Sequence, residues 1–196
     1  MLCGPLSVFT GKDGMLKPTA VNTIKQLLET LRKQGHDVFS AHELEQWGKA
    51  FGQQTSLQAL ARDKQGTQVA DYVFIMPSFA GHTSLGTSLE LGFLDARMSK
   101  GNGGRPIKGL IILRHKGNSH PELRGAIEGL KAEYPTKVEV LDFKTPRELI
   151  QLIKERTQTI PLHKQAIGRM RLAIGRKLNT PKGATYFTKK QRRRPV

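Results

Sequence analysis

The chain has 196 residues, 37% of them hydrophobic, and a net charge of +16 from 32 basic and 16 acidic side chains. Its single cysteine excludes an intramolecular disulfide, and it has no apolar run near the roughly 20 residues of a membrane-spanning helix. Because the first residues also lack the basic flank of a secretion signal, we expect a cytoplasmic protein that does not enter a membrane.

Strand-like and helix-like segments alternate along most of the chain. Short apolar runs predict five strands, at Leu6–Gly11, His36–Ala41, Asp71–Pro77, Ile107–His115 and Lys137–Phe143. Between and after them, apolar residues at helical spacing predict helices that begin at Pro18, near residue 54, after Ser84, at Pro121 and at Pro146. Proline suits the first turn of a helix, where its missing N–H has no partner to lose.

This alternation predicts an α/β fold with a parallel sheet, because parallel neighbours need crossover connections of about this length. We expect a flavodoxin-like or Rossmann-like three-layer sandwich, in which a five-stranded parallel sheet lies between two layers of helices. In such sheets ligands bind beyond the carboxyl ends of the strands. The loops that follow the predicted strands should therefore form the functional site.

The C-terminal end of the chain carries most of the positive charge. Residues 161–196 contain 11 basic and no acidic residues, whereas the other 160 residues contain 21 basic and 16 acidic residues. We predict a folded domain over residues 1–158 and a basic extension over residues 159–196, with an amphipathic helix followed by a disordered tail. Such an extension binds nucleic acid, directs a eukaryotic protein to the nucleus, or is a solvated end with neither role.

The stretch SLGTSLELG, Ser84 to Gly92, follows the third predicted strand and begins a helix. Free backbone N–H groups and the positive end of the helix dipole favour an anion at such a start, and small residues allow it to approach closely. Ser84, Gly86 and Thr87 therefore form a candidate monophosphate site. Ordinary capping of the helix by serine or threonine explains the same residues.

Glu90 lies further along this helix, on the face of Gly86 and Thr87 and among apolar neighbours. A carboxylate beside an anion site can act as a nucleophile or stabilise an oxocarbenium ion when a sugar loses its leaving group. A solvated glutamate on a helix surface is the alternative interpretation. A second carboxylate is then required, and Asp63, on the preceding helix, is a candidate. Asp71 begins the third strand at its amino end, away from the expected site, and is interpreted as structural.

Four segments, in this order, resemble the nucleoside 2-deoxyribosyltransferase superfamily and, most closely, its 2′-deoxynucleoside 5′-phosphate N-hydrolase branch. They are FTGKDG, AHELEQWG, ARDKQGTQVADYVFIMPS and SLGTSLELG, and the resemblance covers about residues 6–155. It implies that residues 1–158 are a catalytic domain. It also implies that Glu90 attacks the anomeric carbon and that Asp63 orients the sugar and assists departure of the base.

The resemblance implies further substrate-binding residues. Ser84 and Gly86 match the phosphate-binding turn of the family, with Thr87 beside them, and Gly11 matches a glycine that lets the substrate lie against the first strand. His42 falls in a loop near the base. Lys12 stands where the branch has a hydroxyl residue, and it can contact phosphate directly as a point charge.

A second group of residues relates to a partner subunit. The segment Arg124–Ala126 is similar to one that approaches the phosphate of a neighbouring subunit. The resemblance therefore implies a homodimer with shared sites, in which Ser119 or His120 supplies a donor across the interface.

The function expected from these residues is hydrolysis of a nucleoside 5′-monophosphate to a free base and a sugar 5-phosphate. We expect no cofactor and no metal, since the histidines lack ligand spacing. Two alternatives use the same nucleophile, namely base exchange by a deoxyribosyltransferase and cleavage of an NAD-type dinucleotide. A third, of another class, is a non-catalytic protein that binds nucleic acid through residues 161–196.

Overall fold

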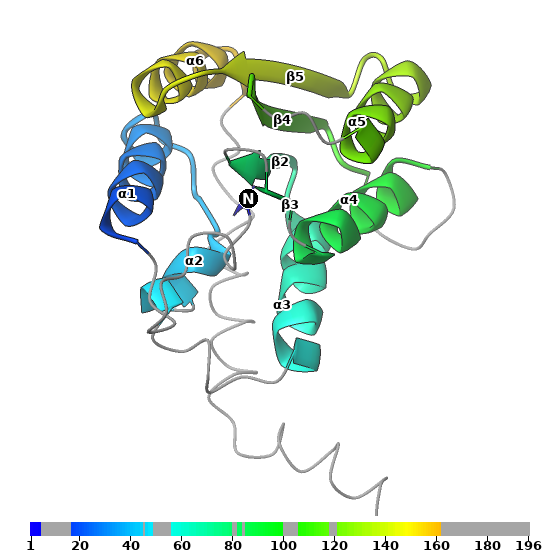
Figure 1. Ribbon diagram of the computed structural model, residues 1–196, viewed down its shortest axis with the longest axis horizontal. Coiled ribbons are helices and arrows are strands. Elements are labelled where there is room, and N and C mark those ends of the chain that lie inside the picture. Colours follow the sequence, from blue (N-terminus) through cyan, green and yellow to red (C-terminus); the bar gives the residue numbers. More distant parts are fainter. Residues whose placement is uncertain are drawn as a thin grey trace, which may run out of the picture. The chain divides into compact units, whose positions relative to one another are not determined.

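Four parallel strands form the centre of the structure, which is a computed structural model (Figure 1). They are hydrogen-bonded in the order β1 (Leu2–Cys3), β2 (Tyr72–Phe79), β4 (Gly109–His115) and β5 (Val138–Phe143). A short strand, β3 (His82–Thr83), pairs antiparallel with the end of β2. The structure describes residues 1–4, 17–44, 46–48, 56–79, 82–83, 85–99, 106–117 and 121–161.

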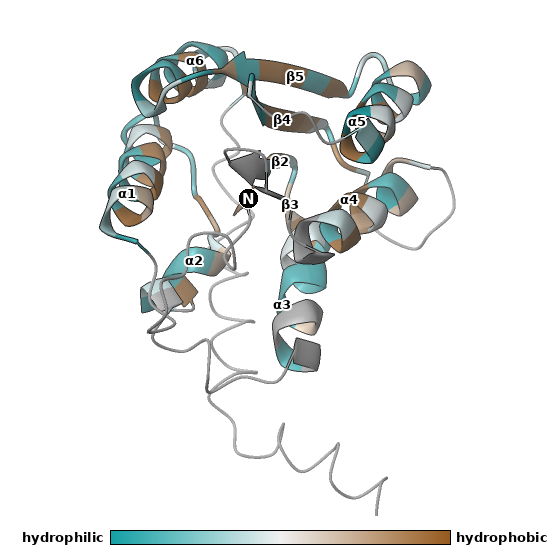
Figure 2. Ribbon diagram, in the orientation of Figure 1, coloured by the Kyte–Doolittle hydropathy of each residue, from teal (hydrophilic) through white to brown (hydrophobic). Residues whose placement is uncertain are grey.

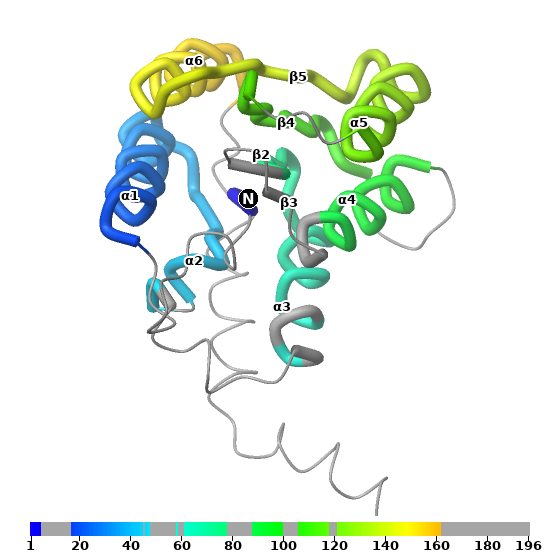
Figure 3. Tube along the Cα trace, in the orientation of Figure 1, coloured from blue at the N-terminus to red at the C-terminus, as the bar shows by residue number. Residues whose placement is uncertain are grey.

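The sheet confirms the α/β class but not the predicted five parallel strands. β2, β4 and β5 lie where the third, fourth and fifth strands were predicted. The predicted second strand, His36–Ala41, contributes a single parallel bridge between Ser40 and Leu2, where the chain passes from α1 to α2 (Figure 3). β1 precedes the predicted first strand, Leu6–Gly11, which lies outside the described residues.

Alternate residues of the strands point into two separate cores. Phe74 and Met76 of β2 join the core formed with α1 and α6, whereas Val73 and Ile75 join the core formed with α4 and α5. β4 divides in the same way, with Ile111 and Leu113 in the first core and Leu110 and Ile112 in the second. The ribbon of β4 is accordingly coloured as hydrophobic in Figure 2. Both faces of the sheet are therefore covered by helices, as a parallel sheet requires.

The first layer of helices consists of α1 (Pro18–Lys33) and α6 (Pro146–Gln158). α1 begins at Pro18 as predicted, and its apolar stripe of Ala20, Ile24, Leu27, Leu28 and Leu31 is buried. Gly35, just beyond its end, has a φ of 87°, a conformation that glycine adopts without strain. At the start of α6, Thr145 accepts a hydrogen bond from the backbone N–H of Glu148 at 3.2 Å.

The second layer contains α4 (Leu85–Met98) and α5 (Pro121–Glu133), and α3 (Ser56–Val69) packs beside α4 (Figure 1). Arg97 ties α4 to the end of α3, because its Nη1 donates to the carbonyl oxygen of Ala70 at 3.0 Å and also to that of Thr67. Two short helices, α2 (Ala41–Leu44) and η2 (Gln46–Gly48), follow the Ser40 bridge.

The chain divides into two compact units, Met1–Pro161 and Leu162–Val196. The second unit lies outside the described residues, so the predicted basic helix and tail stay predictions. Over the ranges given above, no helix is long and apolar enough to cross a membrane.

Candidate functional site

The candidate site lies where the chain reverses its direction across the sheet. From β1 the chain passes to Ser40 on one side, and it then reaches β2 on the other side after α3. In open parallel sheets such a switch point leaves room for a ligand beyond the carboxyl ends of the two strands. Cys3 and Gly4 stand at that end of β1.

Glu90 is held inside the protein by the packing of α4. Its side chain is only 6% exposed, so it is not a solvated surface glutamate. Leu94, one turn further along the same face, is fully buried, and Arg97, on this face too, donates to the end of α3. α4 therefore turns the face that carries Glu90 toward α3 and the sheet.

Asp63, the second predicted carboxylate, lies on α3 and is bound by its neighbour in the sequence. Arg62 is buried, and its Nε and Nη2 atoms donate to the same oxygen, Oδ1 of Asp63, at 3.2 and 3.1 Å. Burial raises the pKa of Asp63, and the Arg62 guanidinium opposes this shift without cancelling it. Asp63 is thus a carboxyl group whose proton affinity is higher than usual.

The negative charges of both carboxylates act on the thiol of Cys3. Burial raises the pKa of Cys3 well above its ordinary value, and the negative charges of Glu90 and Asp63 raise it further. Charges act on one another over several ångströms without contact, so both carboxylates lie within electrostatic range of this thiol. Glu90 and Asp63 therefore come from two helices that pack against each other, α4 and α3, and both charges act on the thiol at the carboxyl end of β1.

His42, which was expected near the base, is fully buried on α2. Its Nδ1 lies 3.4 Å from the hydroxyl oxygen of Ser40, and no described residue makes a hydrogen bond to its Nε2. Burial, with a smaller contribution from the positive charge of Arg62, lowers the pKa of His42 to about 4. The imidazole is consequently neutral near pH 7, and Arg62 acts on both His42 and Asp63.

The other expected site residues are described in part or not at all. Gly86 and Thr87 lie in the first turn of α4, as predicted. Asp71, which was interpreted as structural, stands at the amino end of β2, with an oxygen 3.6 Å from Nζ of Lys108. The remaining expected residues lie outside the described ranges: Gly11, Lys12, Ser84, Ser119 and His120.

Sequence reasoning missed three residues at this place, namely Cys3, Gly4 and Arg62. The apolar run before Gly4 is too short to be recognised as a strand, so the glycine after the first strand was sought at Gly11. Arg62 is not marked out in the sequence, and in the structure Gly66 lies one turn later on the same helix face. A Cβ atom at Gly66 would lie 2.6 Å from the ring of Phe39, so α3 approaches its neighbours closely along that face.

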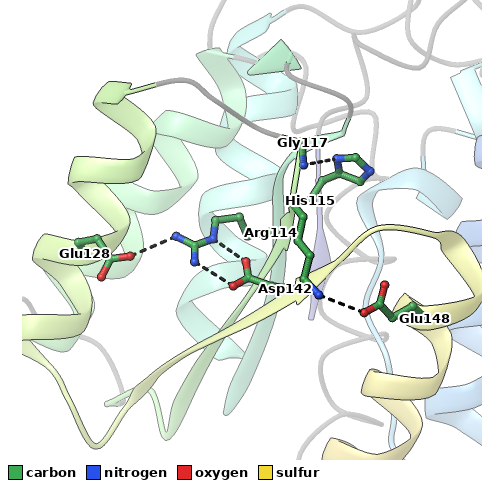
Figure 4. A network of polar contacts seen from close by, with 7 residues as sticks. Arg114, His115, Gly117, Glu128, Asp142 and Glu148 are labelled. Carbon is green, nitrogen blue, oxygen red and sulfur yellow. Dashed lines mark hydrogen bonds and ion pairs between the residues drawn. The ribbon is translucent and has the colours of Figure 1, made fainter.

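A second polar cluster lies at the carboxyl ends of β4 and β5 (Figure 4). Arg114 donates from Nε and Nη2 to the two oxygens of Asp142 at 2.6 and 2.9 Å, and from Nη1 to Glu128 at 3.1 Å. The guanidinium is thereby shared between two carboxylates and joins β4, β5 and α5. A hollow of about 310 Å³ is lined by Arg114, His115, Lys116, Arg124, Glu128 and Asp142.

The loop after β4 is also fixed by hydrogen bonds (Figure 4). Nδ1 of His115 accepts from the backbone N–H of Gly117 at 3.1 Å, and its Nε2 lies 3.0 Å from the carbonyl oxygen of Lys144. Lys116 contacts Glu148 at 3.4 Å. These contacts give this loop a structural role, and neither Glu90 nor Asp63 takes part in them.

A groove of about 520 Å³ lies between α4 and α5. Its lining includes the apolar residues Leu91 and Leu123 and the acidic residues Asp95, Glu122 and Glu133. On α4 these residues occupy the side of the helix opposite Glu90, so the groove is separate from the candidate site.

No family model and no curated protein matches the chain. Among solved structures, it is similar to an NAD(P)H:quinone oxidoreductase from Methanothermobacter marburgensis, with 12% sequence identity and a TM-score of 0.46. The match covers 82% of this chain and 97% of the other. A similarity of this size gives no information about substrate or reaction.

Proposed function

We propose that the protein hydrolyses the bond between base and sugar in a nucleoside 5′-monophosphate. The observation that carries this proposal is the burial of the Glu90 carboxyl group on α4, the helix that packs against α3, where Asp63 lies. Cleavage of a glycosidic bond commonly uses two carboxyl groups in different environments. Here they come from two helices, and one of them is bound by an arginine.

Glu90 is the proposed nucleophile. Its carboxylate oxygen forms a bond to the anomeric carbon while the carbon–nitrogen bond breaks, and the departing base takes up a proton. Water then attacks the same carbon, releases a proton and displaces Glu90, which returns to its starting state. The products are the free base and the sugar 5-phosphate.

Asp63 has the second role. Its raised pKa suits a group that shares a proton with the departing base or holds a sugar hydroxyl by a hydrogen bond. The phosphate would bind at the first turn of α4, where Gly86 and Thr87 leave backbone N–H groups outside the helical pattern. Gly4, directly after β1, would let the substrate lie against this strand, which is the role that the resemblance implies for Gly11.

The test is to supply the purified full chain with a panel of ribo- and deoxyribonucleoside 5′-monophosphates and to measure the released base by chromatography. We expect Glu90→Gln to reduce kcat by on the order of 10³ or more, because the carboxylate oxygen that forms the bond is lost. Glu133→Gln is the matched control, since it alters a helix glutamate beyond the candidate site, and it should leave the rate unchanged. A Glu90→Gln variant with the full rate would disprove the proposed chemistry.

The same experiment separates the alternatives that use this nucleophile. A second free base added to the reaction is incorporated into a new nucleoside if the protein is a transferase, and it is not incorporated by a hydrolase. Including an NAD-type dinucleotide in the panel tests the third possibility by release of nicotinamide.

Nucleic-acid binding through the basic extension is a second proposal, supported by the 11 basic residues and the lack of acidic residues in 161–196. Binding of this kind weakens as salt rises, because bound cations on the nucleic acid are released. Replacing Arg192, Arg193 and Arg194 by glutamine should reduce the slope of log K against log salt by roughly 3 on duplex DNA. An unchanged slope contradicts a role of these three side chains in binding.

A further inference from the structure

We propose that Arg62 is a positioning residue, which holds Asp63 by one carboxylate oxygen and leaves the other oxygen for the substrate. This inference rests on the proposed function and adds a residue to its machinery. Arg62 itself is not expected to touch the reacting atoms.

The contact with Arg62 leaves the two oxygens of the Asp63 carboxylate in different environments. Both donor atoms of Arg62, Nε and Nη2, bind Oδ1. No described residue makes a hydrogen bond to Oδ2, and the side chain of Asp63 is 18% exposed, against 5% for that of Arg62. One oxygen is therefore fixed inside the protein, while the carboxylate keeps an acceptor for another molecule.

This contact is not the usual ion pair of a helix surface. Neighbouring residues on a helix point about 100° apart, and ion pairs normally form three or four residues apart. The guanidinium of Arg62 must therefore turn along the helix to reach Asp63. It does so in a buried position, where an arginine is rarely found without a partner.

The charges around this pair give Arg62 a second effect. The charges of Asp63 and of Glu90 on α4 act on the thiol of Cys3, and the charge of Arg62 acts on His42 of α2. The positive charge lowers the pKa of Asp63 against the effect of burial, and it also lowers the pKa of His42. Arg62 therefore favours an ionised Asp63 and a neutral His42 together.

Two variants of the full chain, Arg62→Gln and Arg62→Lys, test this role. The readouts are the titrations of the Asp63 carboxyl carbon and the His42 ring by NMR, and the pH profile of base release. In Arg62→Gln we expect the pKa values of both groups to rise, and the limb of the pH profile that reports Asp63 to move to higher pH by the same amount.

Arg62→Lys separates charge from geometry. Lysine keeps the positive charge but offers a point charge in place of two fixed donors. We expect both pKa values to stay near those of the parent chain, while kcat falls on the order of tenfold because Asp63 is less firmly oriented. Arg97→Lys is the matched control, because Arg97 is a buried arginine that binds backbone carbonyls, and it should shift neither pKa.

The outcomes are distinguishable from a failure of the proposed function. If the parent chain releases no base from any nucleotide, the proposed function fails, whatever the variants do. If the parent chain is active and Arg62→Gln leaves both pKa values and the pH profile unchanged, the role of Arg62 is overturned. If Arg62→Gln does not fold, Arg62→Lys decides, and an unchanged kcat in that variant overturns the role.

Discussion

Replacing Asp142 by asparagine removes the carboxylate that Arg114 binds through two hydrogen bonds of 2.6 and 2.9 Å. Hydrogen bonds to charged groups contribute about 1.5–3 kcal/mol each when shielded from water. The side chain of Asp142 is 37% exposed, and solvent screening reduces this contribution. We therefore expect Asp142→Asn to lower the free energy of unfolding by about 1 kcal/mol at pH 7, or about 3 °C in Tm.

The pH dependence of this loss gives the sharper test. Hydrogen bonds from Arg114 lower the pKa of Asp142 in the folded state. The stabilisation is therefore complete above the ordinary carboxyl pKa of about 4 and disappears as the pH falls through the lower, folded value. Urea unfolding followed by circular dichroism between pH 7 and pH 3 should show the two chains converging toward acid.

Glu128→Gln serves as the control for this prediction. Glu128 receives one bond from Arg114, at 3.1 Å, and its side chain is 56% exposed. Its replacement should cost about 0.3 kcal/mol or less. Equal stability of Asp142→Asn and the parent chain at pH 7, or a difference that widens toward acid, would refute the assigned role of the ion pair.

Two further predictions concern the buried groups of the candidate site. The pKa of His42 is about 4 in the folded chain and about 6.5 when exposed, so the unfolded chain binds an extra proton between these two pH values. The free energy of unfolding should therefore fall by about 3 kcal/mol from pH 6.5 to pH 4. The variant His42→Gln should lack this fall when urea unfolding is measured across the same pH range. Cys3 is buried, with its pKa raised well above the ordinary value, so a thiol reagent at pH 8 should label it rapidly in urea and very slowly in the folded chain. Rapid labelling without urea would contradict the burial of this thiol.

The parts of the fold that the sequence predicted well are those with long, repetitive apolar patterns. α1 and α6 carry buried residues at helical spacing, and β2 and β4 are nearly continuous apolar runs. The second strand could not be predicted in the same way. His36–Ala41 has the composition of a strand, but its partner β1 has only two residues, so only Ser40 finds a bridge. The length of a strand depends on its neighbour, which local sequence does not reveal.

The candidate site was predictable only where a residue type stands out from its surroundings. Glu90 does so, because it is a charged residue among apolar ones, and its burial agrees with that prediction. Arg62 does not, because α3 is rich in polar residues and an arginine there resembles a solvated one. Its burial follows from the close approach of α3 at Gly66, which is a tertiary contact.

The pairing of β3 with β2 determines how the protein tolerates insertions ahead of α4. Ser78 lies opposite Thr83, and Phe79 opposite His82, so extra residues at the tip of this small hairpin lengthen it without displacing its base. One extra residue between Thr83 and Leu85 has a different effect, since each residue of a helix turns it by about 100°. If the base of the hairpin stays in place, such an insertion would rotate α4 and carry Glu90 out of the interior, whereas an insertion between Phe79 and His82 would leave this carboxylate in place.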